Sequence, residues 1–139
     1  MANETTSIIR RLLLLLATPM SYILIVDDHA DIRRLLSISL RKEFPVKEAE
    51  DGVSAIDTLR HEHPKIVLLD VMMPGEMNGL QVLDAIKADP KTRDILVAII
   101  SARAQTTDHD EARLRGADAY FVKPFSPLQV VAWVRSHMN

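Results

Sequence analysis

The chain has 139 residues, of which 47% are hydrophobic and 26% are charged, as in an ordinary globular domain and unlike a disordered chain. Its 17 basic and 19 acidic side chains give a net charge of −2, so composition offers no electrostatic reason to expect nucleic acid or anionic lipid as a partner. The absence of cysteine excludes disulfides and thiolate metal sites and fits a reducing cytoplasm. At this length we expect a single domain with its own core.

Residues 1–20 form an N-terminal extension. Arg10 and Arg11 precede an apolar run over 12–17, which imitates a secretory signal but is shorter than the usual apolar core of about 7–15 residues. The wider stretch 12–26 contains Thr, Pro and Ser and falls short of the roughly 20 apolar residues that span a bilayer. We therefore reject both interpretations. We expect either a short helix packed on the domain or on a second copy, or a disordered extension before an alternative start at Met20.

Five apolar runs predict β-strands in the rest of the chain. The runs at 22–26 (YILIV), 65–69 (KIVLL) and 95–100 (ILVAII) are continuous rather than alternating, which is typical of parallel strands covered on both faces. A weaker run lies at 46–50, and another at 119–122.

Helical patterns lie between and after these runs. Apolar residues recur near a helical period over 30–43, 53–63 and 80–87. Residues 105–115 are polar and give a weaker pattern that ends at Gly116, a suitable C-terminal cap. The last helix, 127–137, follows Ser126 as N-cap and begins with proline. The alternation predicts an α/β domain with right-handed crossovers, a five-stranded parallel sheet and five helices.

Polar side chains stand at the carboxyl ends of four predicted strands, where an open parallel sheet binds its ligands. Asp27 and Asp28 follow the first strand, Asp70 the third, Ser101 the fourth and Lys123 the fifth. Each alone has an ordinary interpretation as a helix cap, a loop residue or a surface lysine. Together they predict one rim that carries three carboxylates, a hydroxyl and an ammonium group.

Three carboxylates at one rim repel each other, and a hard divalent cation relieves that repulsion. Mg²⁺ prefers oxygen ligands and commonly takes one or two carboxylates plus a phosphate oxygen, a demand that Asp27 or Asp28 with Asp70 can meet. A carboxylate beside the ion can attack phosphorus to give an aspartyl phosphate. Ser101 would then donate a hydrogen bond to a phosphoryl oxygen, and Lys123 would pair with another, or with Asp70 before phosphorylation.

Six segments resemble the receiver domain of bacterial two-component response regulators: ILIVDDH (23–29), AEDG (49–52), IVLLDVMMPG (66–75), IISA (99–102), GAD (116–118) and YFVKPF (120–125). The resemblance covers about residues 21–137. It implies a single flavodoxin-like, doubly wound domain over 21–139, with strand order 2-1-3-4-5, that follows the extension 1–20.

The resemblance also implies roles for the rim residues. Asp70 matches the phosphoacceptor. Asp27 and Asp28 match the acidic pair that holds Mg²⁺ together with Asp70, and Met72 matches the position that lends its backbone carbonyl to the ion.

The remaining matched residues belong to the switch. Ser101 matches the switch hydroxyl and Tyr120 the aromatic residue that changes rotamer with it. Lys123 matches the lysine that contacts the phosphoryl group, and its peptide bond to Pro124 is expected to be cis.

The implied function is a signalling switch rather than an enzyme, since the domain would catalyse only its own phosphorylation and dephosphorylation. A histidine kinase or histidine phosphotransfer protein would donate the phosphoryl group in the cytoplasm. The face formed by 105–115, 119–122 and 127–137 would then bind a downstream protein in trans. A homodimer is a further expectation; direct contact with nucleic acid or membrane is not. The chain could also be cut from a larger hybrid protein.

The alternative function is a degenerate receiver that serves as a phosphorylation-independent interaction scaffold, although such receivers usually lack a site residue and all five are present here. Two other classes fit poorly. A haloacid-dehalogenase-type phosphatase needs a second acid two residues after its nucleophile, where Met72 stands. A flavin electron carrier needs a glycine- and hydroxyl-rich phosphate loop after the first strand, where the chain has Asp27 and Asp28.

Several positions depart from the family pattern or remain open. Gly79 lies nine residues after Asp70, one more than is usual, and Asn78 stands where aspartate is common. Met72 and Arg103 are expected to flank the phosphoryl group and to control access of water.

The histidines are expected to have structural or solvated roles. His61 and His63, two residues apart, do not share a helix face and are not expected to bind a metal. His29 is expected to begin a helix, and His109 and His137 to be simple surface residues.

Overall fold

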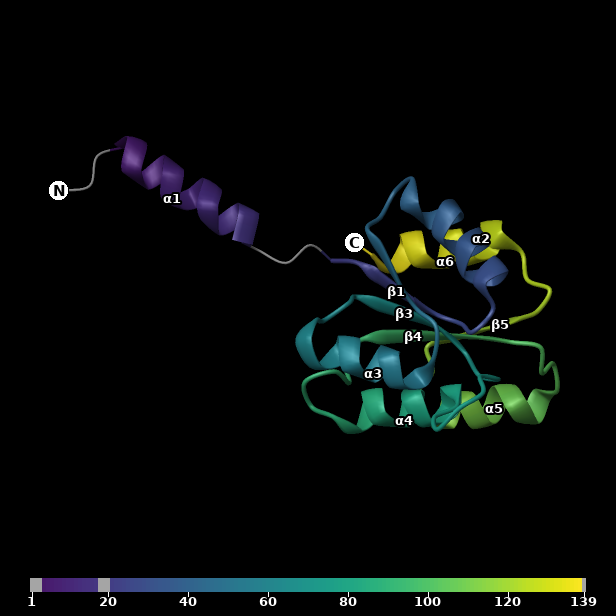
Figure 1. Cartoon of the computed structure of the whole chain (residues 1–139). Coiled ribbons are helices and arrows are strands. Elements are labelled where there is room, and N and C mark those ends of the chain that lie inside the picture. The colour runs from purple at the N-terminus through teal and green to yellow at the C-terminus, as the bar shows by residue number, and fades with distance from the viewer. Residues whose placement is uncertain (1–3, 18–20, 139) are drawn as a thin grey trace.

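The computed structural model describes residues 4–17 and 21–138 of the chain (Figure 1). Helices and strands alternate in the order α1 (Glu4–Ala17), β1 (Ile23–Val26), α2 (Ala30–Arg41), β2 (Val46–Ala49), α3 (Gly52–His61), β3 (Ile66–Asp70), α4 (Gly79–Ala88), β4 (Leu96–Ser101), α5 (Thr106–Leu114), β5 (Ala119–Val122) and α6 (Pro127–His137).

The five strands form one parallel sheet in the order β2-β1-β3-β4-β5. The predicted fold class and strand order are therefore confirmed. Strands β1 and β3 are buried along their whole length, which explains why their sequences are continuously apolar rather than alternating.

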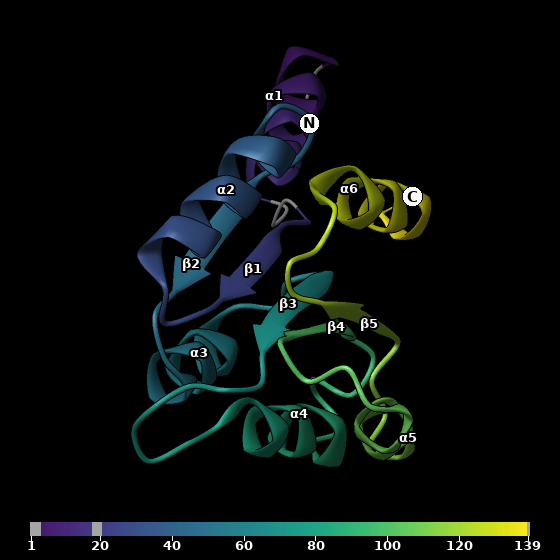
Figure 2. The same cartoon turned by 90° about the vertical axis from the view of Figure 1, so that its right-hand side faces the viewer.

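Two layers of helices cover the sheet (Figure 2). Helices α2 and α6 lie on one face, and α3, α4 and α5 lie on the other. Successive residues of β1 belong to different cores: Ile23 and Ile25 pack with α2 and α6, whereas Leu24 and Val26 pack with α3 and α4. The fold thus has two apolar cores separated by the sheet.

The predicted element boundaries agree with the structure to within two residues, apart from β5 and α6, which agree fully. The largest differences lie at helix ends. Helix α3 begins at Gly52 because the Asp51 carboxylate accepts the Ser54 N–H in a capping box, and it ends at His61 because Glu62 is extended. The predicted caps are present: the Ser126 side chain accepts the Gln129 N–H, and Gly116 has a left-handed φ of 103°.

Helix α1 confirms the helical alternative for the N-terminal extension, while Met20 lies outside the described residues. Ile8, Ile9, Leu12 and Leu13 are each more than half exposed, and neither core contains a described side chain of α1. Figure 1 shows α1 projecting from the domain, so its expected packing on the domain is not found. No helix in the described segments combines the length and the apolar character needed to cross a membrane.

Candidate metal and phosphoryl site

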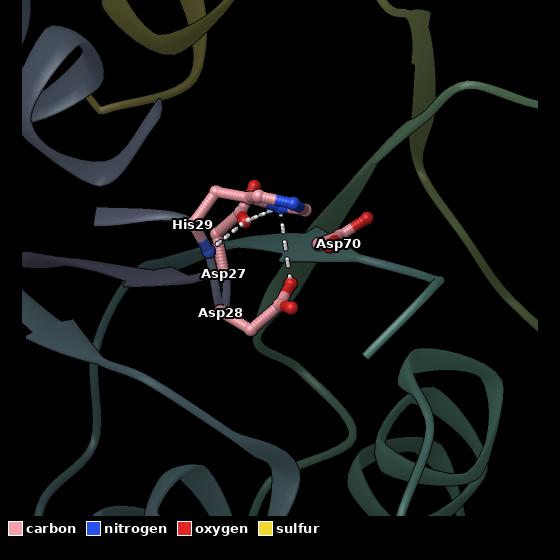
Figure 3. Close-up of side chains that lie close together, drawn as sticks. All are labelled: Asp27, Asp28, His29 and Asp70. Atoms are coloured by element: carbon pink, nitrogen blue, oxygen red, sulfur yellow. Dashed lines mark hydrogen bonds and ion pairs between the residues drawn. The ribbon is translucent and has the colours of Figure 1, made fainter. Parts of the chain in front are cut away.

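Three acidic side chains converge at the carboxyl ends of β1 and β3 (Figure 3). Asp27 and Asp28 follow the last residue of β1, and Asp70 is the last residue of β3. His29 lies beside them, and the four side chains offer one possible metal-ligand atom each, all within 4.8 Å of one another. The parallel register explains the convergence, because β1 and β3 are paired from Ile23 and Ile66 onward and so end side by side.

Lys123 brings a positive charge to this cluster from the end of β5. Its Nζ lies 3.0 Å from Asp27 Oδ2 and 3.4 Å from Asp70 Oδ1. The lysine is mostly buried, with 18% of its side chain exposed, and both carboxylates are only 2% exposed. Asp27 is thus the closer partner, whereas the sequence suggested Asp70. The Lys123–Pro124 peptide bond is cis, as expected.

Two buried carboxylate oxygens of the cluster remain unsatisfied within the described part of the chain. Asp70 Oδ1 accepts the Met72 N–H at 3.2 Å, but Asp70 Oδ2 has no hydrogen-bond partner. Asp28 Oδ1 also has none, although His29 Nδ1 lies 3.2 Å away. Buried polar atoms are normally hydrogen-bonded, so these two oxygens indicate that something outside the chain completes the site.

The environment of Asp70 raises the pKa of its carboxyl group to about 6. Burial is the largest cause, and the neighbouring Asp27 carboxylate adds to it, while the Lys123 ammonium group and the Met72 N–H oppose the rise. Asp70 is therefore a carboxylate at neutral pH, but one that gains strongly from any added positive charge.

A divalent cation that prefers oxygen fits this donor set. Three carboxylates supply the ligand type that Mg²⁺ takes, and such an ion would satisfy the buried oxygens of Asp28 and Asp70. The Met72 backbone N–H donates a hydrogen bond to Asp70 Oδ1. The role of the Met72 carbonyl remains a prediction.

Ser101 and Tyr120 are linked through the backbone of Arg103. The fully buried Ser101 accepts the Arg103 N–H on its Oγ at 3.1 Å. The Tyr120 hydroxyl donates to the Arg103 carbonyl at 2.8 Å. A movement of the Ser101 hydroxyl therefore acts on the same residue that holds the Tyr120 ring.

His109 corrects the expectation of a simple surface histidine. Its ring stacks on Tyr120 with centroids 4.0 Å apart and planes inclined by 25°, and its Nε2 is buried. This contact could not be predicted from the sequence, because residues 106–113 are predominantly polar.

The lengthened loop after Asp70 ends in an ordered cap. Asn78 and Gln81 form a reciprocal capping box at the start of α4. A Cβ atom on Gly79 would lie 2.0 Å from the Asp70 carbonyl oxygen, so only glycine fits there. Met72 and Arg103 line one hollow together; their expected control of water access remains a prediction.

His29 is the site residue that the sequence reasoning overlooked. It was expected only to begin a helix, and it is the N-cap of α2 without a side-chain cap bond. Its ring instead faces Asp27 and Asp28. Its position directly after the acidic pair was the available signal. His63, in contrast, pairs with Asp94 at 2.9 Å, away from the cluster.

The chain is similar to a family and to several characterised proteins. The response regulator receiver domain family matches residues 23–135. The phosphate regulon transcriptional regulatory protein PhoB of Klebsiella pneumoniae is 40% identical over 118 residues, which cover 84% of this chain and 51% of PhoB. The DNA-binding response regulator MtrA of Mycobacterium leprae is 38% identical, with the same coverage of both chains. The chain thus spans about half the length of these relatives.

Solved structures agree with the fold. The response regulator DrrB of Thermotoga maritima superposes with a TM-score of 0.76 and 27% identity, over 84% of this chain and 52% of DrrB. The chemotaxis protein CheY4 of Vibrio cholerae gives a TM-score of 0.78 over 86% of this chain and 99% of CheY4, at 24% identity. The chain belongs to the response regulator receiver domain family.

Proposed function

We propose that this receiver domain is a phosphorylation switch. Asp70 takes a phosphoryl group from a phosphohistidine of a sensor kinase or a histidine phosphotransfer protein, with Mg²⁺ held by Asp27, Asp28 and Asp70. The observation that carries the proposal is the buried Asp70 Oδ2, which has no partner in the described part of the chain and lies beside two further carboxylates and a facing lysine. Family membership supports it, because receiver domains bind Mg²⁺ in such an acidic pocket.

In this phosphoryl transfer, the protein supplies the position of the reacting groups and the charges that stabilise them. An Asp70 carboxylate oxygen forms a bond to phosphorus while the bond from phosphorus to the donor histidine breaks, and the electron pair returns to the imidazole. A bound divalent ion supplies positive charge to the phosphoryl oxygens. Lys123, whose Nζ already lies 3.4 Å from Asp70 Oδ1, offsets the negative charge of the phosphoryl group. The Ser101 hydroxyl donates a hydrogen bond to a phosphoryl oxygen.

The switch follows from the shared contacts of Arg103. When Ser101 Oγ turns toward the phosphoryl group, it gives up the Arg103 N–H. Arg103 is then free to move, and with it the carbonyl that holds the Tyr120 hydroxyl. The face of α5, β5 and α6 thereby changes its affinity for a partner protein, because the phosphoryl group favours one of two states.

The wider role follows from this assignment. The domain catalyses only its own phosphorylation and dephosphorylation, and it acts in the cytoplasm, where the kinase donors of response regulators present their phosphohistidine. Its partners are the phosphoryl donor and a downstream protein bound in trans. A second copy joined through the exposed apolar side of α1 is a further candidate partner.

The test is incubation with acetyl phosphate and Mg²⁺ followed by intact-mass measurement. We expect a mass gain of one phosphoryl group that is absent from Asp70→Ala. Asp94→Ala is the matched control, since Asp94 is 70% exposed and paired with His63, and it should be phosphorylated normally. No mass gain in the wild-type protein, together with no binding of Mg²⁺, would favour the scaffold alternative.

A further inference from the structure

His29 lies within ligand distance of the acidic pair that precedes it. Its Nδ1 is 3.3 Å from Asp27 Oδ1 and 3.2 Å from Asp28 Oδ1. Figure 3 shows the ring beside both carboxylates, with Asp70 opposite. The cluster therefore combines oxygen donors with one imidazole nitrogen.

These separations match those between ligands of one metal ion. Zn–N and Zn–O bonds are about 2.0–2.2 Å long, so two ligands of the same tetrahedral ion lie roughly 3.3–3.5 Å apart. The two carboxylate oxygens beside His29 Nδ1 lie close to this spacing. No large movement is required to bring the three atoms onto a common ion.

The two carboxylate oxygens of Asp27 contact different residues. Oδ2 faces Lys123 at 3.0 Å. Oδ1 accepts the His29 backbone N–H at 2.8 Å and also lies 3.3 Å from His29 Nδ1. This bond fixes the backbone of His29 next to the acids, while its side chain stays 64% exposed. The imidazole can thus reach an ion without a large desolvation cost.

A further observation separates this site from an ordinary acidic cluster. Asp70 is 2% exposed, its carboxylate belongs to the cluster, and its buried Oδ2 has no partner among the described residues. An electrostatic pairing of His29 with Asp27 and Asp28 leaves that oxygen unsatisfied. An ion shared by His29, the acidic pair and Asp70 satisfies it.

We propose that His29 is a fourth side-chain ligand of the metal site and determines its metal selectivity. The inference rests on the metal site of the proposed function and extends it. With Asp27, Asp28 and Asp70, His29 gives the site a mixed nitrogen and oxygen set, which suits Zn²⁺ better than oxygen ligands alone do. Mg²⁺ gains little from an imidazole, so its binding depends on the carboxylates and hardly on His29.

The direct test detects the nitrogen on the metal. Protein with ¹⁵N-labelled histidine is loaded with Mn²⁺, and electron spin-echo envelope modulation records coupling to nitrogen. We expect a histidine coupling in the wild-type protein and in His63→Gln, the matched control, and none in His29→Gln. A wild-type spectrum without the coupling, an unchanged spectrum of His29→Gln, or no bound Mn²⁺ would overturn the proposal.

Calorimetric titration gives the corresponding affinities. On removal of one nitrogen ligand, we expect His29→Gln to bind Zn²⁺ about tenfold more weakly or worse, while Mg²⁺ binding changes less than about twofold. Circular dichroism checks that the variant is folded. Equal losses for both ions would overturn the assignment, because they would mean that His29 supports the carboxylates rather than ligating.

Failure of this inference is distinguishable from failure of the proposed function. Normal phosphorylation of Asp70 with Mg²⁺ in a protein that shows no nitrogen coupling contradicts only the role of His29. A histidine coupling in a protein that acetyl phosphate never modifies supports the mixed ligand set and contradicts the phosphorylation switch.

Discussion

The two ends of the sheet treat charge in opposite ways. At the amino end, the Tyr22 hydroxyl donates to Glu62 at 3.2 Å, Glu62 pairs with Lys47, and the Lys47 ammonium group lies 4.9 Å above the Tyr22 ring. Each polar group there has a partner. At the carboxyl end, three carboxylates face one lysine and leave two buried oxygens unsatisfied. The polar groups of the first arrangement pair with one another, whereas the second leaves carboxylate oxygens available to a cation.

The pKa values of the two ends express the same difference. At the amino end, the Lys47 hydrogen bond lowers the pKa of Glu62, the ordinary result of a satisfied carboxylate. At the carboxyl end, burial raises the pKa of Asp70 to about 6 despite the nearby lysine. An end with paired charges stabilises the fold modestly, while an end with excess negative charge costs stability until a cation arrives.

Removal of one lysine from each end should separate them most clearly. Lys123→Met leaves Asp27 and Asp70 buried without their cation, and we expect a loss of about 3 kcal/mol in unfolding free energy without metal. Lys47→Met breaks an ion pair whose partners are 51% and 37% exposed, so its loss should stay below about 1 kcal/mol. Urea denaturation near neutral pH measures both. Equal losses of unfolding free energy in the two variants would contradict the proposed difference between the two ends of the sheet.

Asp70→Asn should stabilise the metal-free protein. The folded-state pKa of Asp70, about 6, lies above the ordinary 3.8, so ionisation costs the fold stability as pH rises between these values. The neutral variant escapes that cost, and we expect a gain of about 2 kcal/mol above pH 7. The gain should shrink as pH falls through 6 and vanish below about pH 4. A pH series of urea denaturations checks it, with Asp57→Asn, at an exposed position outside the cluster, as the control.

Addition of Mg²⁺ should stabilise the carboxyl end alone. A ligand about fivefold above its dissociation constant adds about 1 kcal/mol to the unfolding free energy. We expect this gain in the wild-type protein and in Lys47→Met, but not in Asp70→Asn, which lacks one charge of the cluster. Thermal denaturation with and without Mg²⁺ measures the difference. An undiminished gain in Asp70→Asn would place the ion elsewhere.

The smallest effect is expected from Tyr22→Phe at the amino end. It removes one hydrogen bond to Glu62 and retains the packing of the ring, so the loss should be about 0.5–1 kcal/mol. The extent of Asp70 phosphorylation should not change. A lower extent, measured by intact mass, would show that the two ends are coupled.

The fold could be predicted because its signals are local. The continuous apolar runs over β1 and β3 reflect burial on both faces of the sheet, and Ser126 and Gly116 mark helix ends by their own chemistry. The predicted start of α3 was one residue too late, because the Asp51 N-cap, and not the first apolar residue of the helical pattern, sets where the helix begins.

The residues that meet at the carboxyl end of the sheet could also be predicted, since parallel strands end at one edge. Which of these side chains pair with each other could not be predicted. Strand order alone does not decide that Lys123 lies closer to Asp27 than to Asp70. The contact of His109 with Tyr120 and that of His29 with the acids depend on side-chain rotamers across elements that periodicity does not describe.

The contact of Gly79 with the main chain of Asp70 limits how the domain can respond to modification. Asp70 is paired with Ile100 of β4 on one side, and the first turn of α4 lies against its carbonyl on the other. Its main chain is therefore wedged between a strand and a helix and has no room to yield. A phosphoryl group on Asp70 would therefore have to be accommodated by its side chain and by the loop 71–78 rather than by a shift of the Asp70 main chain.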